Sequence, residues 1–343
     1  MKYGQTLFFA FYFLSLFVGC ASTNVAPMPE WVLNYQKEFP ISTYIAQKGT
    51  GKTADNAKIE AAASLSYYFD TTVNANRESN YRSFETTENG KYSAKSERET
   101  KRETKVTTDT ALRAVEYTEP WYSKKDKTWH CVAYLVRETA WKNFEPSVRL
   151  AKDNFAGYYN KALEEKEPFE RLRLLGIART KGSDFMDAIS YAQFLSEPLT
   201  NTNFQADILL LSELSSRQQE EKGKIPIFLE VENDSASRMY GTFAKAFAEC
   251  GFKVTKERGE SVYTAKAKVE SEQVVQDGLM IATPSVRLSL VGKNGSVYSY
   301  AKSGNRVKAY TQSLLEKKSL ESLCPVVEQT FFEDFNAALS GRK

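Results

Sequence analysis

The sequence is poor in the residue types that many enzymes use for catalysis. Its 343 residues include a single histidine, His130, and four cysteines. A catalytic triad or a histidine-bearing zinc site would have to use that histidine. Because His130 stands among strand-forming residues with no acid–nucleophile pattern beside it, an ordinary strand residue is the simpler interpretation. G-x-S-x-G and H-E-x-x-H motifs and clustered cysteine ligands are also missing from the sequence. We therefore expect no enzymatic activity, no metal and no cofactor.

The sequence also lacks a large excess of positive or negative charge. The formal net charge is +3, which is too small to indicate a nucleic-acid partner, and we expect none. Hydrophobic residues make up 42% and charged residues 26% of the chain, which are ordinary values for a globular protein. The length suits roughly two domains with their own cores.

One apolar run stands out, at the N-terminus. Lys2 precedes the apolar stretch 7–18, and small residues follow it, which is typical of a secretory signal. The run is shorter than the roughly 20 residues that a spanning helix needs. Cys20 directly follows Gly19 and therefore resembles the lipid-modified cysteine of a bacterial lipobox, although Phe17 replaces the usual leucine. The alternative is an ordinary signal peptide followed by an unmodified thiol.

Lipidation at Cys20 would anchor the mature chain to a membrane, because each buried CH₂ of an acyl chain contributes about 0.8 kcal/mol. Ala21 follows in place of the aspartate that retains lipoproteins of enteric bacteria in the inner membrane. By that analogy we expect an outer-membrane lipid anchor, with the protein facing the periplasm or the cell surface. Apart from its lipid, the mature chain should be water-soluble.

Three cysteines would then remain. Cys250 and Cys324 lie in predicted helices of the same C-terminal unit, so they are the favoured pair for a disulfide in an oxidising compartment. Three reduced thiols, with Cys131 as the third, are the alternative, since free cysteine is among the most buried residue types.

A short strand at 44–46 leads into Gly49-Thr50-Gly51-Lys52-Thr53 and then into a helix. The end of this stretch resembles a phosphate-binding loop, but the position of the first glycine holds Ala46, so we interpret it as a tight turn with glycines at positive φ. We predict a helix after Thr53, which is a good N-cap. Apolar residues recur at three- and four-residue steps and share one face of this helix: Ala54, Ala57, Ala61, Leu65 and Tyr68.

One series of motifs resembles the LPP20 family of bacterial envelope lipoproteins. The series consists of Pro29-Glu30-Trp31, a strand, Gly49-x-Gly51 and a helix carrying Ala57, Ala61 and Leu65. The resemblance covers residues 29–141. It implies a small α/β sandwich without known catalysis, in a family that includes proteins associated with the outer membrane and the flagellum.

The stretch 74–110 is strongly polar, with mixed charges and frequent serine and threonine. Asn89-Gly90 is a hairpin signal, so we predict a solvated β-hairpin arm over residues 76–106. A disordered loop is the alternative. Two strands are expected next, at 111–117 and 128–136, and the second is apolar enough to be central.

The rest of the chain changes pattern twice. Residues 142–223 show helical periodicity throughout and predict a stack of helical hairpins. Residues 224–343 return to strand–helix–strand–strand–strand–strand–helix order, with Gly251 closing a helix. The chain is expected to end as one or two helices over 313–339, with Pro325 marking a break or restart. The predicted fold is α+β, with two small α/β sandwich domains joined by a helical segment. The predicted divisions are a signal peptide 1–19, a lipidated tether 20–40, an LPP20-like domain 41–141, a helical segment 142–223 and a C-terminal domain 224–343.

These features favour a membrane-anchored, non-enzymatic lipoprotein that meets envelope protein partners through its folded units. Exposed aromatic residues suit such contacts, and Trp31, Trp121 and Tyr122 are candidates, although burial in the core of the domain is the alternative. A periplasmic small-molecule carrier or sensor, or an envelope hydrolase that uses two carboxylates, are the other functions that the sequence allows.

Overall fold

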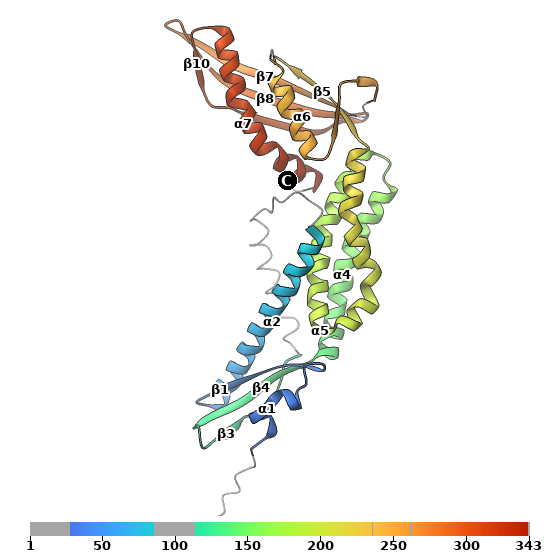
Figure 1. The fold of residues 1–343 in the computed structure, drawn as a ribbon, viewed down its shortest axis with the longest axis vertical. Coiled ribbons are helices and arrows are strands. Elements are labelled where there is room, and N and C mark those ends of the chain that lie inside the picture. The colour runs from blue at the N-terminus through green and yellow to red at the C-terminus, as the bar shows by residue number, and fades with distance from the viewer. Residues whose placement is uncertain (1–27, 86–113, 235, 261–262, 342–343) are drawn as a thin grey trace, which may run out of the picture.

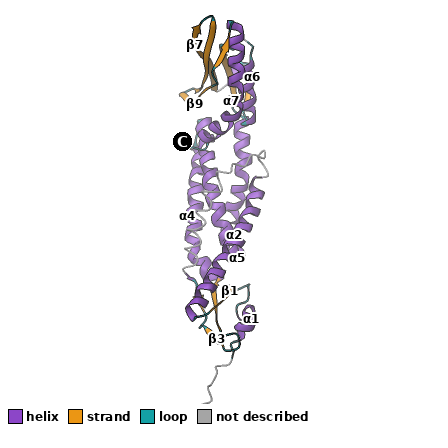
Figure 2. Cartoon of the chain, turned by 90° about the vertical axis from the view of Figure 1, so that its left-hand side faces the viewer, coloured by secondary structure: helices purple, strands orange, loops and turns teal. Residues whose placement is uncertain are grey.

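The structure is a computed structural model that describes residues 28–85, 114–234, 236–260 and 263–341. The molecule is elongated, with a small sheet at one end, a larger sheet at the other and a helical segment between them (Figures 1 and 2). This α+β architecture confirms the predicted fold class.

The N-terminal sheet is built around one central strand, as predicted. All pairings in it are antiparallel. β4 (Thr128–Val136) pairs along one edge with β1 (Tyr44–Gly51) and along the other with β2 (Glu116–Tyr117) and β3 (Trp121–Ser123).

The outer face of this sheet is covered by α1 (Glu30–Glu38). Trp31, Val32 and Phe39 are buried there against Val132. The chain from residue 29 is therefore part of the folded unit and not of the tether predicted for 20–40. Burial of these large side chains outweighs the cost of ordering a short helix.

Gly49 and Gly51 lie within β1, not in the predicted turn, and neither has a positive φ. Their role is close packing. A Cβ on Gly49 would overlap the backbone nitrogen of Ala61 and lie 2.7 Å from its Cα, and one on Gly51 would lie 2.6 Å from the nitrogen of Ala57. Glycines in the strand and alanines in the helix therefore let the two backbones meet.

α2 (Ala54–Glu85) covers the inner face of the sheet and continues along the helical segment. Helix thus occupies residues 76–85, where one strand of the hairpin arm was predicted. Phe69 packs on Tyr191 with ring centroids 4.7 Å apart, and Arg77 pairs with Asp187 at 2.6 Å. Phe69 and Arg77 thus hold α2 against a neighbouring helix as it enters the polar stretch, and such tertiary contacts override local propensity. The rest of the predicted arm, including Asn89-Gly90, lies outside the described residues.

The helical segment consists of α4 (Arg137–Glu164) and α5 (Pro168–Gly223), and the helical prediction for 142–223 is confirmed. α5 bends at Ser196, two residues before Pro198, and its halves pack antiparallel. Arg171 and Glu221, from opposite ends of α5, are 2.8 Å apart. None of the helices in the described ranges is both long and apolar enough to cross a membrane.

The C-terminal sheet follows the predicted order of elements, with longer strands and one added short strand. Parallel pairing joins β5 to its neighbours β6 and β7, and the remaining pairs are antiparallel. The strands are β5 (Pro226–Glu232), β6 (Lys253–Thr255), β7 (Tyr263–Gln276), β8 (Leu279–Gly292), β9 (Gly295–Ser303) and β10 (Val307–Ala309), with a 3-10 turn at Arg258–Glu260.

Two parallel helices, α6 (Arg238–Glu249) and α7 (Gln312–Leu339), cover one face of this sheet. Gly251 follows α6 at φ 88°, as its predicted role as a helix terminator requires. Of the two predicted possibilities, α7 forms the single helix, and the predicted break at Pro325 is absent. A continuous buried stripe on both sides of that proline outweighs its cost of about 3 kcal/mol; its members are Leu320, Leu323, Val327, Phe331 and Phe335.

Candidate functional site

The most elaborate polar arrangement lies where the helical segment meets the C-terminal sheet. Here the start of α5, the start of β7 and the end of α7 converge. The Phe169 ring lies 5.9 Å from that of Tyr263 and 6.0 Å from that of Phe335. Gly176 approaches the backbone of α7 so closely that a Cβ would lie 3.1 Å from the Cα of Ser340. The two units therefore share a close-packed apolar contact.

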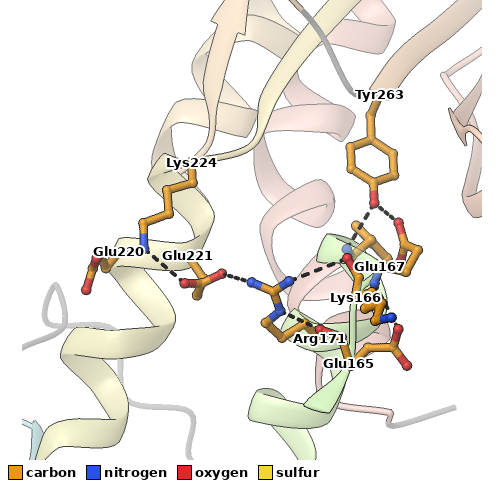
Figure 3. Close-up of polar contacts among 9 residues, drawn as sticks. Glu165, Lys166, Glu167, Arg171, Glu220, Glu221, Lys224 and Tyr263 are labelled. Carbon is orange, nitrogen blue, oxygen red and sulfur yellow. Dashed lines mark hydrogen bonds and ion pairs between the residues drawn. The ribbon is translucent and has the colours of Figure 1, made fainter. Parts of the chain in front are cut away.

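The hydroxyl of Tyr263 is the centre of the polar part of this junction (Figure 3). It accepts a hydrogen bond of 3.0 Å from the backbone N–H of Phe169 and donates one to the carboxylate of Glu167. The other oxygen of that carboxylate accepts from the N–H of Glu170 at 2.6 Å. Glu167 is the N-cap of α5, so one side chain both begins the helix and attaches it to the sheet.

Arg171 joins the two ends of α5 to the loop before it (Figure 3). Its Nε donates to the carbonyl of Glu165 at 3.0 Å, and its Nη1 pairs with Glu221 at 2.8 Å. Lys224, at the C-cap of α5, contacts Glu220 at 2.7 Å and Glu221 at 3.1 Å. The hydrogen bonds that the Lys224 ammonium donates to these two carboxylates raise the pKa of Lys224, and they lower the pKa of Glu220.

A shallow groove of about 270 Å³ lies beside these ion pairs. Its charged lining residues already have partners, because Arg171 and Lys224 are ion-paired and the guanidinium of Arg217 lies 5.5 Å from the centre of the Tyr159 ring. Among the described residues, the groove therefore presents neither a poised acid–base pair nor an apolar cavity for a carrier. The junction instead holds the C-terminal unit in a set orientation on the helices. We call the hydrogen bonds of the Tyr263 hydroxyl with Phe169 and Glu167 the Tyr263 clamp.

His130 is a buried strand residue on the outer face of the N-terminal sheet. Its Nε2 is 3.3 Å from the hydroxyl of Thr128, and burial, followed by the nearby charge of Lys48, lowers its pKa. The Lys48 amine donates to the carbonyl of Val32 in α1 at 2.6 Å, and burial lowers its pKa as well. Within the described ranges, no group of three histidine, cysteine or acidic side chains could hold a metal ion.

The three aromatic candidates lie near one another but differ in exposure. Trp31 is buried between α1 and the sheet, and Trp121 is half-buried against the same apolar cluster. Tyr122 is 40% exposed and packs against Trp129 with the rings tilted and their centroids 5.4 Å apart. Tyr122 alone of the three presents a largely accessible ring.

The three cysteines among the described residues, Cys131, Cys250 and Cys324, are free thiols, so the predicted bond between Cys250 and Cys324 is absent from the structure. α6 and α7 run parallel, and Phe247 near the end of α6 packs on Phe335 at 5.6 Å. Cys324 precedes Phe335 by eleven residues, which is about 16 Å of helix. A disulfide needs Cα atoms within about 7 Å, so the two thiols are at different levels of the helix pair. The predicted lipidation site, Cys20, lies outside the described residues.

The residues of the junction were missed by the sequence reasoning. Tyr263 and Phe169 are 94 residues apart, and each appears in the sequence only as one apolar position among many. A glutamate before Pro168 is a weak N-cap signal that could have indicated Glu167, but nothing local indicates its partner.

No family model matches the sequence, and no curated protein matches it either. Solved structures with a similar arrangement include the secreted protein HP1454 from Helicobacter pylori, at 13% identity, covering 84% of this chain and 98% of that one with a TM-score of 0.34. A minor lipoprotein from Acinetobacter baumannii is 9% identical, covering 33% and 95% with a TM-score of 0.25. Lipoprotein GNA1162 from Neisseria meningitidis is 16% identical, covering 31% and 99% with a TM-score of 0.19. At these scores and identities the likenesses carry no argument about function, and the LPP20 resemblance rests on the motifs alone.

Proposed function

We propose that the protein is a lipid-anchored envelope lipoprotein that acts by binding other envelope proteins and not by catalysis. The observation that carries this proposal is Cys20, placed directly after a small residue at the end of an N-terminal apolar run. The LPP20 resemblance extends the proposal to the outer membrane and to assemblies such as the flagellum.

The shape of the molecule supports this proposal. The described chain begins at the end formed by α1 and the N-terminal sheet, and the C-terminal sheet lies at the opposite end (Figure 1). The 28 residues of α4 alone span about 42 Å. An anchor at the N-terminal end would therefore hold the C-terminal unit well away from the membrane surface, and the Tyr263 clamp would keep it in one orientation.

The anchoring claim is tested by replacing the proposed lipid acceptor. Cell envelopes are separated from soluble protein for the unmodified chain, for Cys20→Ala and for Cys324→Ala, which removes a different cysteine. We expect the unmodified chain and Cys324→Ala in the membrane fraction, from which detergent releases them. We expect Cys20→Ala in the soluble fraction. Membrane association of Cys20→Ala that requires detergent for release would contradict the proposal.

The partner claim is tested by affinity isolation from gently solubilised envelopes, with Cys20→Ala as the control. A reproducible envelope or flagellar partner that is lost in the control would support an anchored interaction protein. Recovery of the protein alone would contradict that role and direct attention to the carrier function.

A further inference from the structure

A cluster of exposed lysines lies at the end of the N-terminal sheet farthest from the helical segment. Lys52 follows β1, and Lys124, Lys125 and Lys127 occupy the turn between β3 and β4. Gly51 pairs with Trp129, and Ser123 with Thr128, so the two loops leave the same edge of the sheet. α4 follows the opposite end of β4, so these lysines lie at the end of the sheet away from α4.

The geometry of the turn presents the lysines outward. The hydroxyl of Ser123 accepts from the N–H of Asp126 at 3.2 Å and donates to its carboxylate at 2.9 Å. Asp126 is thereby occupied within the turn, and Lys127 completes it at φ 53°. The two loops carry four exposed lysines and one exposed aspartate, Asp126, and remain net positive when the exposed Asp55 in the first turn of α2 is included.

The start of the described chain lies close to this surface. Val32 in the first turn of α1 contacts Lys48, and Lys48 pairs with Val132, three residues beyond Trp129. Cys20 precedes Met28 by eight residues, which reach at most about 29 Å when fully extended. An acyl chain on Cys20 would thus bring a membrane surface within reach of the basic loops.

We propose that Lys52, Lys124 and Lys125 bind the anionic phospholipid headgroups of the leaflet in which the protein is anchored. Juxtamembrane basic residues are attracted to anionic lipid surfaces, and the attraction decays within a Debye length. Tyr122, exposed on the adjoining strand, is a residue type that sits at headgroup level. Contact at this surface would orient the long axis of the molecule away from the membrane. The proposal rests on the proposed anchoring for its orientation, but the binding itself is a property of the protein surface.

The experiment uses residues 21–343, which contain every described residue and no lipid acceptor. Co-sedimentation is measured with vesicles of phosphatidylcholine alone and of phosphatidylcholine mixed with phosphatidylglycerol. We expect binding to the anionic vesicles that weakens as salt is added. The triple variant K52E/K124E/K125E should bind them at least about a hundredfold more weakly, because each basic residue near the surface contributes about fivefold.

The matched control is K253E/K256E/K293E, which makes the same charge change at exposed lysines of the C-terminal unit. It should retain most of the binding. Equal loss in both triple variants would overturn the proposal in favour of attraction by net charge, and so would absence of any preference for anionic vesicles. Because no acyl chain is present, failure here is distinguishable from failure of anchoring, which the Cys20→Ala fractionation reports.

Discussion

The phenol of Tyr263 and the carboxylate of Glu167 meet across the junction between the C-terminal sheet and α5, although 96 residues separate them. The same phenol accepts from the backbone N–H of Phe169. Strand, helix N-terminus and helix cap are thus joined through one hydroxyl in a largely apolar contact. A hydrogen bond in such surroundings is costly to lose, because its partners are left without water.

Tyr263→Phe removes this hydroxyl and keeps the ring. We expect the free energy of unfolding to fall by about 2 kcal/mol, since the N–H of Phe169 loses its acceptor. Denaturant unfolding measures the change, and faster amide exchange at residues 169–171 should accompany it. Tyr310→Phe, at a side chain that is 75% exposed, should change neither quantity. Equal effects of the two substitutions would contradict the clamp.

Gly49→Ala tests the close packing of β1 on α2. The added Cβ would overlap the Ala61 backbone, and since neither element can move without opening the core, we expect a loss of about 3 kcal/mol. Gly157→Ala is the matched control, because a Cβ there has nothing within 4 Å. In the exposed interior of a helix this change should stabilise the protein by about 1 kcal/mol. Unchanged stability of Gly49→Ala would show that the backbones do not approach as described.

His130 gives the stability of the N-terminal unit a predictable pH dependence. Its pKa is lowered in the folded protein from an ordinary value of 6.5, so the unfolded chain binds the proton more readily. The free energy of unfolding should therefore rise with pH between the folded and unfolded pKa values, and it should fall as the pH drops below 6.5. Denaturant midpoints from about pH 7.5 to about pH 5.5 measure this slope.

His130→Gln removes the titrating group while keeping a polar side chain. The loss of stability on acidification should then be smaller than in the unmodified protein, with the remainder due to carboxylates. An identical pH profile in both proteins would contradict the assignment of this slope to His130.

The three described cysteines should differ in reactivity. Burial raises the pKa of Cys250 to about 12, and it also raises that of the buried Cys131, whereas Cys324 is partly exposed. Because the thiolate is the reactive form, iodoacetamide should modify Cys324 first in the folded protein. Peptide mass spectrometry of non-reduced protein measures this order. Recovery of a peptide pair joined through Cys250 and Cys324 would contradict the free thiols.

Much of the local structure could be predicted because it depends on neighbours in the chain. The 3.6-residue pattern from Ala54 identified α2, the apolar run around Cys131 identified the central strand, and Gly251 identified the end of α6. The predictions failed where a distant partner decides the conformation. Helix continues through residues 76–85, where Arg77 pairs with Asp187 of α5, and Pro325 stays within α7 because the stripe around it is buried on the sheet.

The sequence by itself determined the α+β class, the helix after β1, the helical segment and most of the C-terminal order of elements, together with the position of the N-terminal apolar run and its cysteine. The tertiary structure alone decided that Gly49 serves close packing, that Cys250 and Cys324 lie at different levels, and that Tyr263 meets Glu167. The physical reason is the distance along the chain over which each kind of interaction acts. Periodicity, caps and turns act over a few residues, whereas backbone approach, thiol separation and buried hydrogen bonds depend on segments that only folding brings together.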